Sequence, residues 1–289
     1  MRTEPIAARY NRVITLRACS HYPKHLLVGK TLGGETDPIG RWASQVMLIV
    51  NADDLGRSKA ETDVALLCHA KGRITSTSAM VFMKDSERAS EAASGTGLDV
   101  GLHVNFSEEF SAGSIPKELR KAHDQIRRFL TAHKYALLIF NPLLIRQFEF
   151  VFAAQLAEFN RLYGRAPSHL DGHQHLHLAT NMLVQGVLPG GAKVRRNFSF
   201  HRQEKSFVNR WYRRAVDQSL IRRHRVTDYF FSLSDHLAPD RFERVICLAR
   251  EADVELMVHP QRQAEYAFLM SDAYVEALSR VRLAGYDAL

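Results

Sequence analysis

The sequence is poor in cysteine and lacks any long uninterrupted apolar run. Its three cysteines have no paired spacing, which argues against a disulfide framework and against a cysteine-based zinc site. The longest apolar stretch, within residues 135–145, is interrupted by Asn141-Pro142 and falls short of the roughly 18 residues that a membrane-spanning helix needs. We therefore expect no stable membrane insertion, and the cysteine usage favours a cytoplasmic location.

Acidic residues are fewer than basic ones. The chain has 39 Lys and Arg residues against 31 Asp and Glu residues, a formal net charge of +8. A basic chain can attract nucleic acid or anionic lipid. No nucleic-acid-binding motif accompanies the basic stretches 120–128 and 195–225, so we interpret them as solvated helix faces and loops and expect no nucleic-acid partner.

Residues 1–44 differ from the rest of the chain. They show no clear hydrophobic period and no apolar signal-peptide core. We predict a poorly ordered basic leader over residues 1–44 and one domain over residues 45–289. The chain length of 289 residues suffices for a single α/β barrel.

From residue 46 onward, short apolar runs alternate with segments of helical period. The run Val46–Val50 is wholly apolar, which is typical of a strand buried in a parallel sheet. Further strand-like segments lie at 77–81, 98–104, 192–195, 226–231 and 254–258. This alternation predicts βαβ units and a barrel of about six or seven parallel strands, with an open doubly wound sheet as the alternative.

The segment Ser168–Leu178 is unusually rich in histidine. Four of the protein's 14 histidines fall here, together with Asp171. If the segment is extended, every second side chain points to the same face, which would then carry Asp171, His173, His175 and His177. Such a face can hold a cation, although a solvated loop or a set of hydrogen-bonded core histidines would give the same composition.

Other chemically competent residues stand where predicted strands end. Asp53 and Asp54 follow the first strand, His103 ends the third and His259 follows the last. The carboxyl ends of parallel barrel strands share one face, so we expect these residues to converge with the histidine-rich segment. Two adjacent buried carboxylates are costly unless a cation offsets them, and a divalent metal does so. Alternatively, one of the two aspartates caps the helix that follows.

These residues belong to an ordered set of motifs that resembles the YdjC-like carbohydrate deacetylases. That family includes chitooligosaccharide deacetylases and a branch associated with hopanoid biosynthesis. The resemblance covers residues 46–260. The motifs that carry it are Asn51–Gly56, Thr75–Ser78, Val100–His103, Ser168–His177 and Glu255–Pro260.

The resemblance implies a deviant TIM-barrel enzyme that removes acetyl groups from N-acetylated sugars with one divalent metal ion. By position, the residues that resemble the metal ligands are Asp54, His103 and His173. Asp53 resembles the catalytic base, which would take a proton from metal-activated water as that water attacks the amide carbonyl, and His259 resembles a second catalytic group. The resemblance suggests Mg²⁺, whereas two imidazoles and one carboxylate suit Zn²⁺ or another transition metal.

Four further polar residues are candidates for supporting roles. Asp171, His175 and His177 could orient His173 or the metal-bound water. For His175 and His177 we favour packing or hydrogen bonding over direct ligation. Arg195 could bind a sugar hydroxyl or carboxylate, although a surface salt bridge is the simpler interpretation.

Two other functions use the same residues. One is a metal-dependent phosphoesterase on the same scaffold, and the other is a non-catalytic sugar-binding descendant. The deacetylase hypothesis predicts an N-acetylated sugar or oligosaccharide as substrate and allows a homodimer. Residues 105–145 match the family poorly, and we expect them to form loop and helix over the mouth of the site.

Overall fold

The computed structural model describes residues 46–199 and 207–289 of the chain. The predicted leader, residues 1–44, lies outside the described residues, so its poor order and the domain boundary at residue 45 stay predictions. Six parallel strands form one sheet in the order β4-β3-β2-β1-β6-β5. Their bounds are β1 (Leu48–Leu55), β2 (Ser76–Ala79), β3 (Asp99–Val104), β4 (Leu170–Gly172), β5 (Tyr229–Ser232) and β6 (Val254–Val258).

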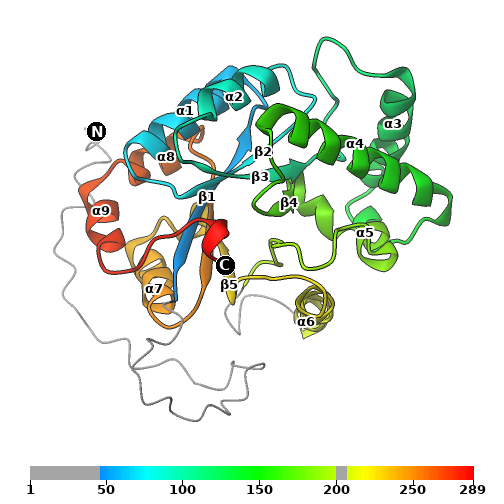
Figure 1. Cartoon of the computed structure of the whole chain (residues 1–289). Helices are drawn as coiled ribbons and strands as arrows, with labels where there is room; N and C mark the ends of the chain where they lie inside the picture. Colours follow the sequence, from blue (N-terminus) through cyan, green and yellow to red (C-terminus); the bar gives the residue numbers. More distant parts are fainter. Residues whose placement is uncertain (1–45, 200–206) are drawn as a thin grey trace, which may run out of the picture.

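Helices surround this sheet (Figure 1). The α-helices are α1 (Lys59–Ala70), α2 (Ser86–Ala93), α3 (Lys117–Thr131), α4 (Ile145–Tyr163), α5 (Thr180–Gln185), α6 (Phe207–Ile221), α7 (Pro239–Ala249), α8 (Gln263–Leu269) and α9 (Asp272–Leu278). Short 3₁₀ segments are η3 (Ala136–Leu138), η4 (Pro142–Leu144), η5 (His173–Leu178), η6 (Leu233–His236) and η7 (Tyr286–Ala288). Among the described residues, none of the helices combines the length and apolarity needed to cross a bilayer.

The sheet curls, and an irregular segment bridges its two edges. The Arg195 amide donates to the Leu170 carbonyl of β4 over 3.0 Å, and the Ser199 amide donates to the Phe230 carbonyl of β5 over 2.8 Å. The strand predicted at 192–195 is present only as isolated parallel bridges to residues 170 and 225. The predicted deviant TIM-barrel-like fold with six or seven parallel strands is confirmed, and the open doubly wound alternative is wrong.

Strand β1 runs through the centre of this sheet and is buried along its whole length. It continues to Leu55 rather than ending after Val50, because β2 and β6 pair with it on both sides through Asn51 and Ala52. On one face, Leu48 and Val50 join the main core that the helices cover. On the other face, Ile49 belongs to a small second cluster.

That second cluster closes the inside of the barrel. Tyr286, in η7, packs against Met47 and Ile49 and is fully buried. Figure 1 shows this C-terminal segment (red) within the ring of helices. The Tyr286 ring stacks on the ring of His169, with 3.8 Å between centroids and 11° between planes. Gly101 faces the same imidazole, and a Cβ at Gly101 would lie 2.3 Å from two of its atoms.

This close approach makes Gly101 irreplaceable without a shift of His169. We expect Gly101→Ala to lower the free energy of unfolding by about 1–3 kcal/mol, because the ring is held between β3 and Tyr286 and cannot move away. Urea denaturation followed by circular dichroism measures the change. Gly113→Ala is the matched control, since a Cβ there meets nothing within 4 Å. Equal stability of the two variants would contradict the packing described here.

Candidate metal centre

Strand β1 delivers two adjacent carboxylates to the site because its end is irregular. In a regular strand neighbouring side chains point to opposite faces. The register between β1 and β2 shifts between Ala52 and Leu55, and Asp54 has a φ of 73°. Aspartate tolerates this left-handed conformation better than most residues do. The helix that follows has Ser58 at its N-cap, so the alternative in which Asp53 or Asp54 caps it is wrong.

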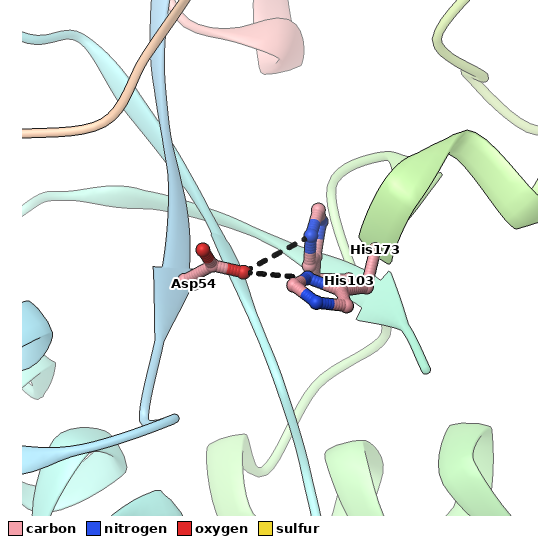
Figure 2. Close-up of side chains that lie close together, drawn as sticks. All are labelled: Asp54, His103 and His173. Carbon is pink, nitrogen blue, oxygen red and sulfur yellow. Dashed lines mark hydrogen bonds and ion pairs between the residues drawn. The ribbon is translucent and has the colours of Figure 1, made fainter. Parts of the chain in front are cut away.

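Asp54 faces two imidazoles from different parts of the chain (Figure 2). Its Oδ1 lies 2.9 Å from Nδ1 of His173 and 3.4 Å from Nε2 of His103. His103 comes from β3, and His173 is the first residue after β4. One donor atom from each of the three residues lies within 4.8 Å of the others. The structure thus brings together the three residues that the sequence suggested as metal ligands.

The far side of the His103 ring is held by two polar groups. Its Nδ1 lies 2.8 Å from Oδ1 of Asp171 and 3.2 Å from Oγ of Ser78. The contact with Asp171 orients the ring so that Nε2 faces Asp54, which is how outer partners orient imidazole metal ligands. Burial lowers the pKa of His103, but the charges of Asp171 and Asp53 outweigh burial and raise it to about 10. The surroundings of this ring therefore stabilise positive charge.

The charge balance of the interior also favours a cation at this point. Four buried carboxylates lie close together, and one guanidinium accompanies them. The acids are Asp53, Asp54, Asp171 and Glu255, and the cation is Arg195. A second group of possible ligands, made of Asp53, His103 and Asp171, already has this guanidinium against both of its carboxylates. At Asp54 a terminal nitrogen of the Arg57 guanidinium lies 3.9 Å from Oδ2, beyond hydrogen-bond distance. Oδ1 faces the two imidazoles, so the donor set and charge there fit a divalent metal.

Arg195 occupies the middle of the barrel rather than its surface. Its two terminal nitrogens donate to the two oxygens of Asp53, each over 2.7 Å, and its Nε donates to Glu255 over 2.7 Å. A terminal nitrogen also lies 2.7 Å from Oδ2 of Asp171. The side chain is fully buried, so the surface salt bridge that we expected is wrong, and Arg195 has no surface with which to bind a sugar.

The histidine-rich segment does not stay extended. After Gly172 the chain enters η5, where Gln174 and His175 have φ values of 53° and 59°. The prediction that four alternate side chains share one face is therefore wrong. His175 instead packs among aromatic rings, including that of Phe198, and His177 binds the Arg195 carbonyl through Nε2 over 3.0 Å.

Asp171 is therefore the only one of the three supporting residues of this segment that contacts a candidate ligand. It contacts His103 rather than His173. Burial raises the pKa of Asp171, but Arg195 and His103 outweigh burial and keep it below its usual value. Asp171 is thus ionised at neutral pH and able to hold the His103 ring in place.

Several polar groups surround the open side of the trio. His259 lies near the same carboxylates; burial lowers its pKa, and the charges of Asp53 and Asp54 oppose that effect. Nε2 of Gln261 donates to Oδ2 of Asp54 over 3.5 Å. Glu108 lies 3.5 Å from Nε2 of His173 and accepts a 2.7 Å hydrogen bond from Nε of Arg57.

Comparison with known sequences places these residues in a family. The sequence profile described as YdjC-like protein matches residues 47–280. The chain belongs to the YdjC-like protein family. The family resemblance inferred from the motifs is confirmed.

Named relatives in this family are similar to part of the chain. A carbohydrate deacetylase of Mus musculus is 33% identical over 159 residues, which cover 52% of this chain and 46% of the mouse protein. A chitooligosaccharide deacetylase of Serratia marcescens is 31% identical over 133 residues, or 46% of this chain and 51% of the bacterial protein. The chain thus spans about half the length of the curated relatives it matches.

One solved structure shares the fold. It is a protein of Enterococcus faecalis V583 assigned provisionally to cellobiose-phosphate cleavage. The TM-score is 0.59 at 21% identity, and the match covers 85% of this chain and 99% of that chain. This likeness shows a common architecture and nothing about the reaction.

Three residues of this YdjC-like site had no role predicted from the sequence. Asn51 and Ser78 both donate hydrogen bonds to Oδ1 of Asp53, over 2.9 and 3.3 Å. Glu255 is fully buried in β6 and binds Arg195 and the hydroxyl of Tyr286. The run Val254–Val258 is otherwise apolar, so the glutamate within it indicated a buried acid, and a buried acid requires a partner.

Arg195 is expected to be essential for stability. Removing one partner of a buried ion pair costs about 3–5 kcal/mol, and here three carboxylates lose their common cation. We therefore expect Arg195→Met to lower the free energy of unfolding by at least that amount, measured by urea denaturation at neutral pH. Arg250→Met, on an exposed residue with no ion pair in the described part of the chain, is expected to stay within about 0.5 kcal/mol of wild type. A wild-type midpoint for Arg195→Met would refute the buried network.

Proposed function

We propose that the protein is a metal-dependent carbohydrate N-deacetylase, a hydrolase that releases acetate from N-acetylated sugars. The observation that carries the proposal is the convergence of Asp54, His103 and His173, with Asp53 and His259 beside them, where the strands end. The relatives named carbohydrate deacetylase and chitooligosaccharide deacetylase support the choice of an acetylated sugar. A cytoplasmic location and a homodimer are proposals that rest on the sequence alone.

Asp54, His103 and His173 would hold one divalent ion. When bound, such an ion polarises an amide carbonyl and lowers the pKa of a coordinated water. Two imidazoles and one carboxylate form a donor set that suits Zn²⁺ or another transition metal better than Mg²⁺, which prefers oxygen ligands. Three protein ligands also leave room for water and substrate.

Asp53 is proposed as the base that accepts a proton from the attacking water. Burial raises its pKa, but the adjacent Arg195 and His103 outweigh burial and hold the pKa below its usual value. Asp53 is therefore ionised at neutral pH. The hydrogen bonds from Asn51, Ser78 and Arg195 fix the orientation of the carboxylate, which is what a positioned base requires.

His259 is proposed as the acid that protonates the departing amine. Burial lowers its pKa, so its protonated form is a strong donor. Its backbone amide donates to Glu265 over 2.6 Å, which fixes the residue after β6. Water then supplies hydroxyl to the acetyl carbon and a proton to nitrogen, and the products are acetate and a free amino sugar.

Loss of one ligand is expected to weaken metal binding strongly. In calorimetric titrations with Zn²⁺, we expect Asp54→Asn and His103→Ala to weaken binding by at least about 100-fold, because each removes a direct donor. Asp63→Asn, on an exposed carboxylate of α1, is the control and should bind like wild type. Wild-type affinity in both ligand variants would rule out the assigned site.

Loss of the base is expected to separate binding from turnover. Asp53→Asn should retain Zn²⁺ binding while acetate release from N-acetylated chitooligosaccharides falls by about 10²–10⁴-fold. A coupled acetate assay, with and without a chelator, measures this change. Cleavage of a generic phosphate ester without acetate release would instead favour the phosphoesterase, and metal-dependent sugar binding without turnover would favour a non-catalytic descendant.

A further inference from the structure

Exposed apolar side chains gather in the segment between α3 and α4, which contains none of the candidate metal ligands. They are large side chains close together in sequence: Tyr135, Leu138, Ile139, Phe140 and Leu143. We call these five residues the apolar patch. Leu143 alone exposes 84% of its surface. A contiguous group of this kind marks an interaction site, whereas single exposed apolar residues need no explanation.

The backbone of the patch is fixed, so the exposure belongs to the fold. The Asn141 amide donates to the side chain of Asn181 over 2.9 Å, and Asn181 donates back to the Asn141 carbonyl over 2.9 Å. Thr180 donates to the Leu137 carbonyl over 3.0 Å. These bonds tie the segment to α5, while the buried side chain of Leu144 anchors it to the core. The apolar side chains are therefore held outward.

The charged residues of the segment that carries the patch have one sign. No acidic residue occurs between Asp124 and Glu149, whereas Arg128, Lys134 and Arg146 in this interval are exposed. None of these three cations has an ion-pair partner in the described part of the chain. Nζ of Lys134 lies 4.9 Å from the centroid of the Tyr135 ring, next to the patch itself.

We propose that the apolar patch docks the protein peripherally on an anionic membrane surface. Lys134 and Arg146 bracket the patch and match negatively charged lipid headgroups. Leucine, isoleucine and phenylalanine side chains bury their surface at the headgroup and acyl boundary, while tyrosine suits the interface itself.

A second copy of the chain fits the patch less well. A symmetric contact through the patch would bring the same unpaired cations of both copies face to face, and like charges in an interface are unfavourable. The membrane surface supplies the opposite charge over the whole area of the patch. The patch contains none of the residues assigned to the metal centre, so membrane docking is independent of the proposed reaction.

Vesicle co-sedimentation of the full chain tests the proposal. We expect binding to vesicles of phosphatidylcholine mixed with phosphatidylserine, weaker binding to phosphatidylcholine alone, and weakening by added salt. Leu143→Ser is expected to weaken binding by about tenfold, because the most exposed leucine of the patch no longer enters the membrane. Lys134→Gln and Arg146→Gln are each expected to weaken it by about fivefold, and only for the anionic vesicles.

Matched controls lie on another side of the molecule. Val275 is 38% exposed and belongs to α9, a helix that lies far from α3 in Figure 1, so Val275→Ser should bind vesicles like wild type. Arg250→Gln is the corresponding charge control. All variants change exposed side chains and should keep the wild-type melting temperature.

Three results would overturn the proposal. The first is that wild-type protein sediments with neither kind of vesicle. The second is that Val275→Ser weakens binding as much as Leu143→Ser does. The third is found without lipid: if analytical ultracentrifugation shows a dimer that Leu143→Ser dissociates, the patch joins two copies of the chain instead.

Discussion

The interior of this barrel depends on one guanidinium. Arg195 contacts Asp53, Asp171 and Glu255 with no exposed surface of its own. Buried carboxylates without a counter-charge cost several kcal/mol each, so the fold can place three of them here only around such a cation. Two of the three also contact or adjoin the candidate metal ligands. The group that stabilises the barrel therefore also positions the site.

The sequence was sufficient to locate the trio for a topological reason. Strands that alternate with helices run parallel, so Asp54, His103 and His173 could be expected at one end of the sheet although 119 residues separate the first from the last. The confirmed barrel-like fold follows from the same alternation. The prediction that these three residues converge required only the positions of the strand ends, which apolar runs indicate to within a few residues.

Other parts of the site could not be predicted from the positions of strand ends. The left-handed backbone at Gln174 and His175 redirects the histidine-rich segment, and no alternation of residue types reports such a turn. The burial of Arg195 was equally hidden, because arginine is usually exposed and its partner Glu255 lies 60 residues further along the chain. Only tertiary contacts reveal that these charges compensate one another.

The position of Tyr286 has a consequence for the order in which the molecule is completed. Its ring fills the inside of the barrel between Ile49 and His169, and its hydroxyl binds Glu255. During synthesis, β1 through β6 leave the ribosome before this side chain does. Until residue 286 has emerged, Ile49 and His169 lack the ring that packs against them, and the acid in β6 lacks one of its two partners. The packing inside the barrel can therefore be completed only after all six strands have been translated.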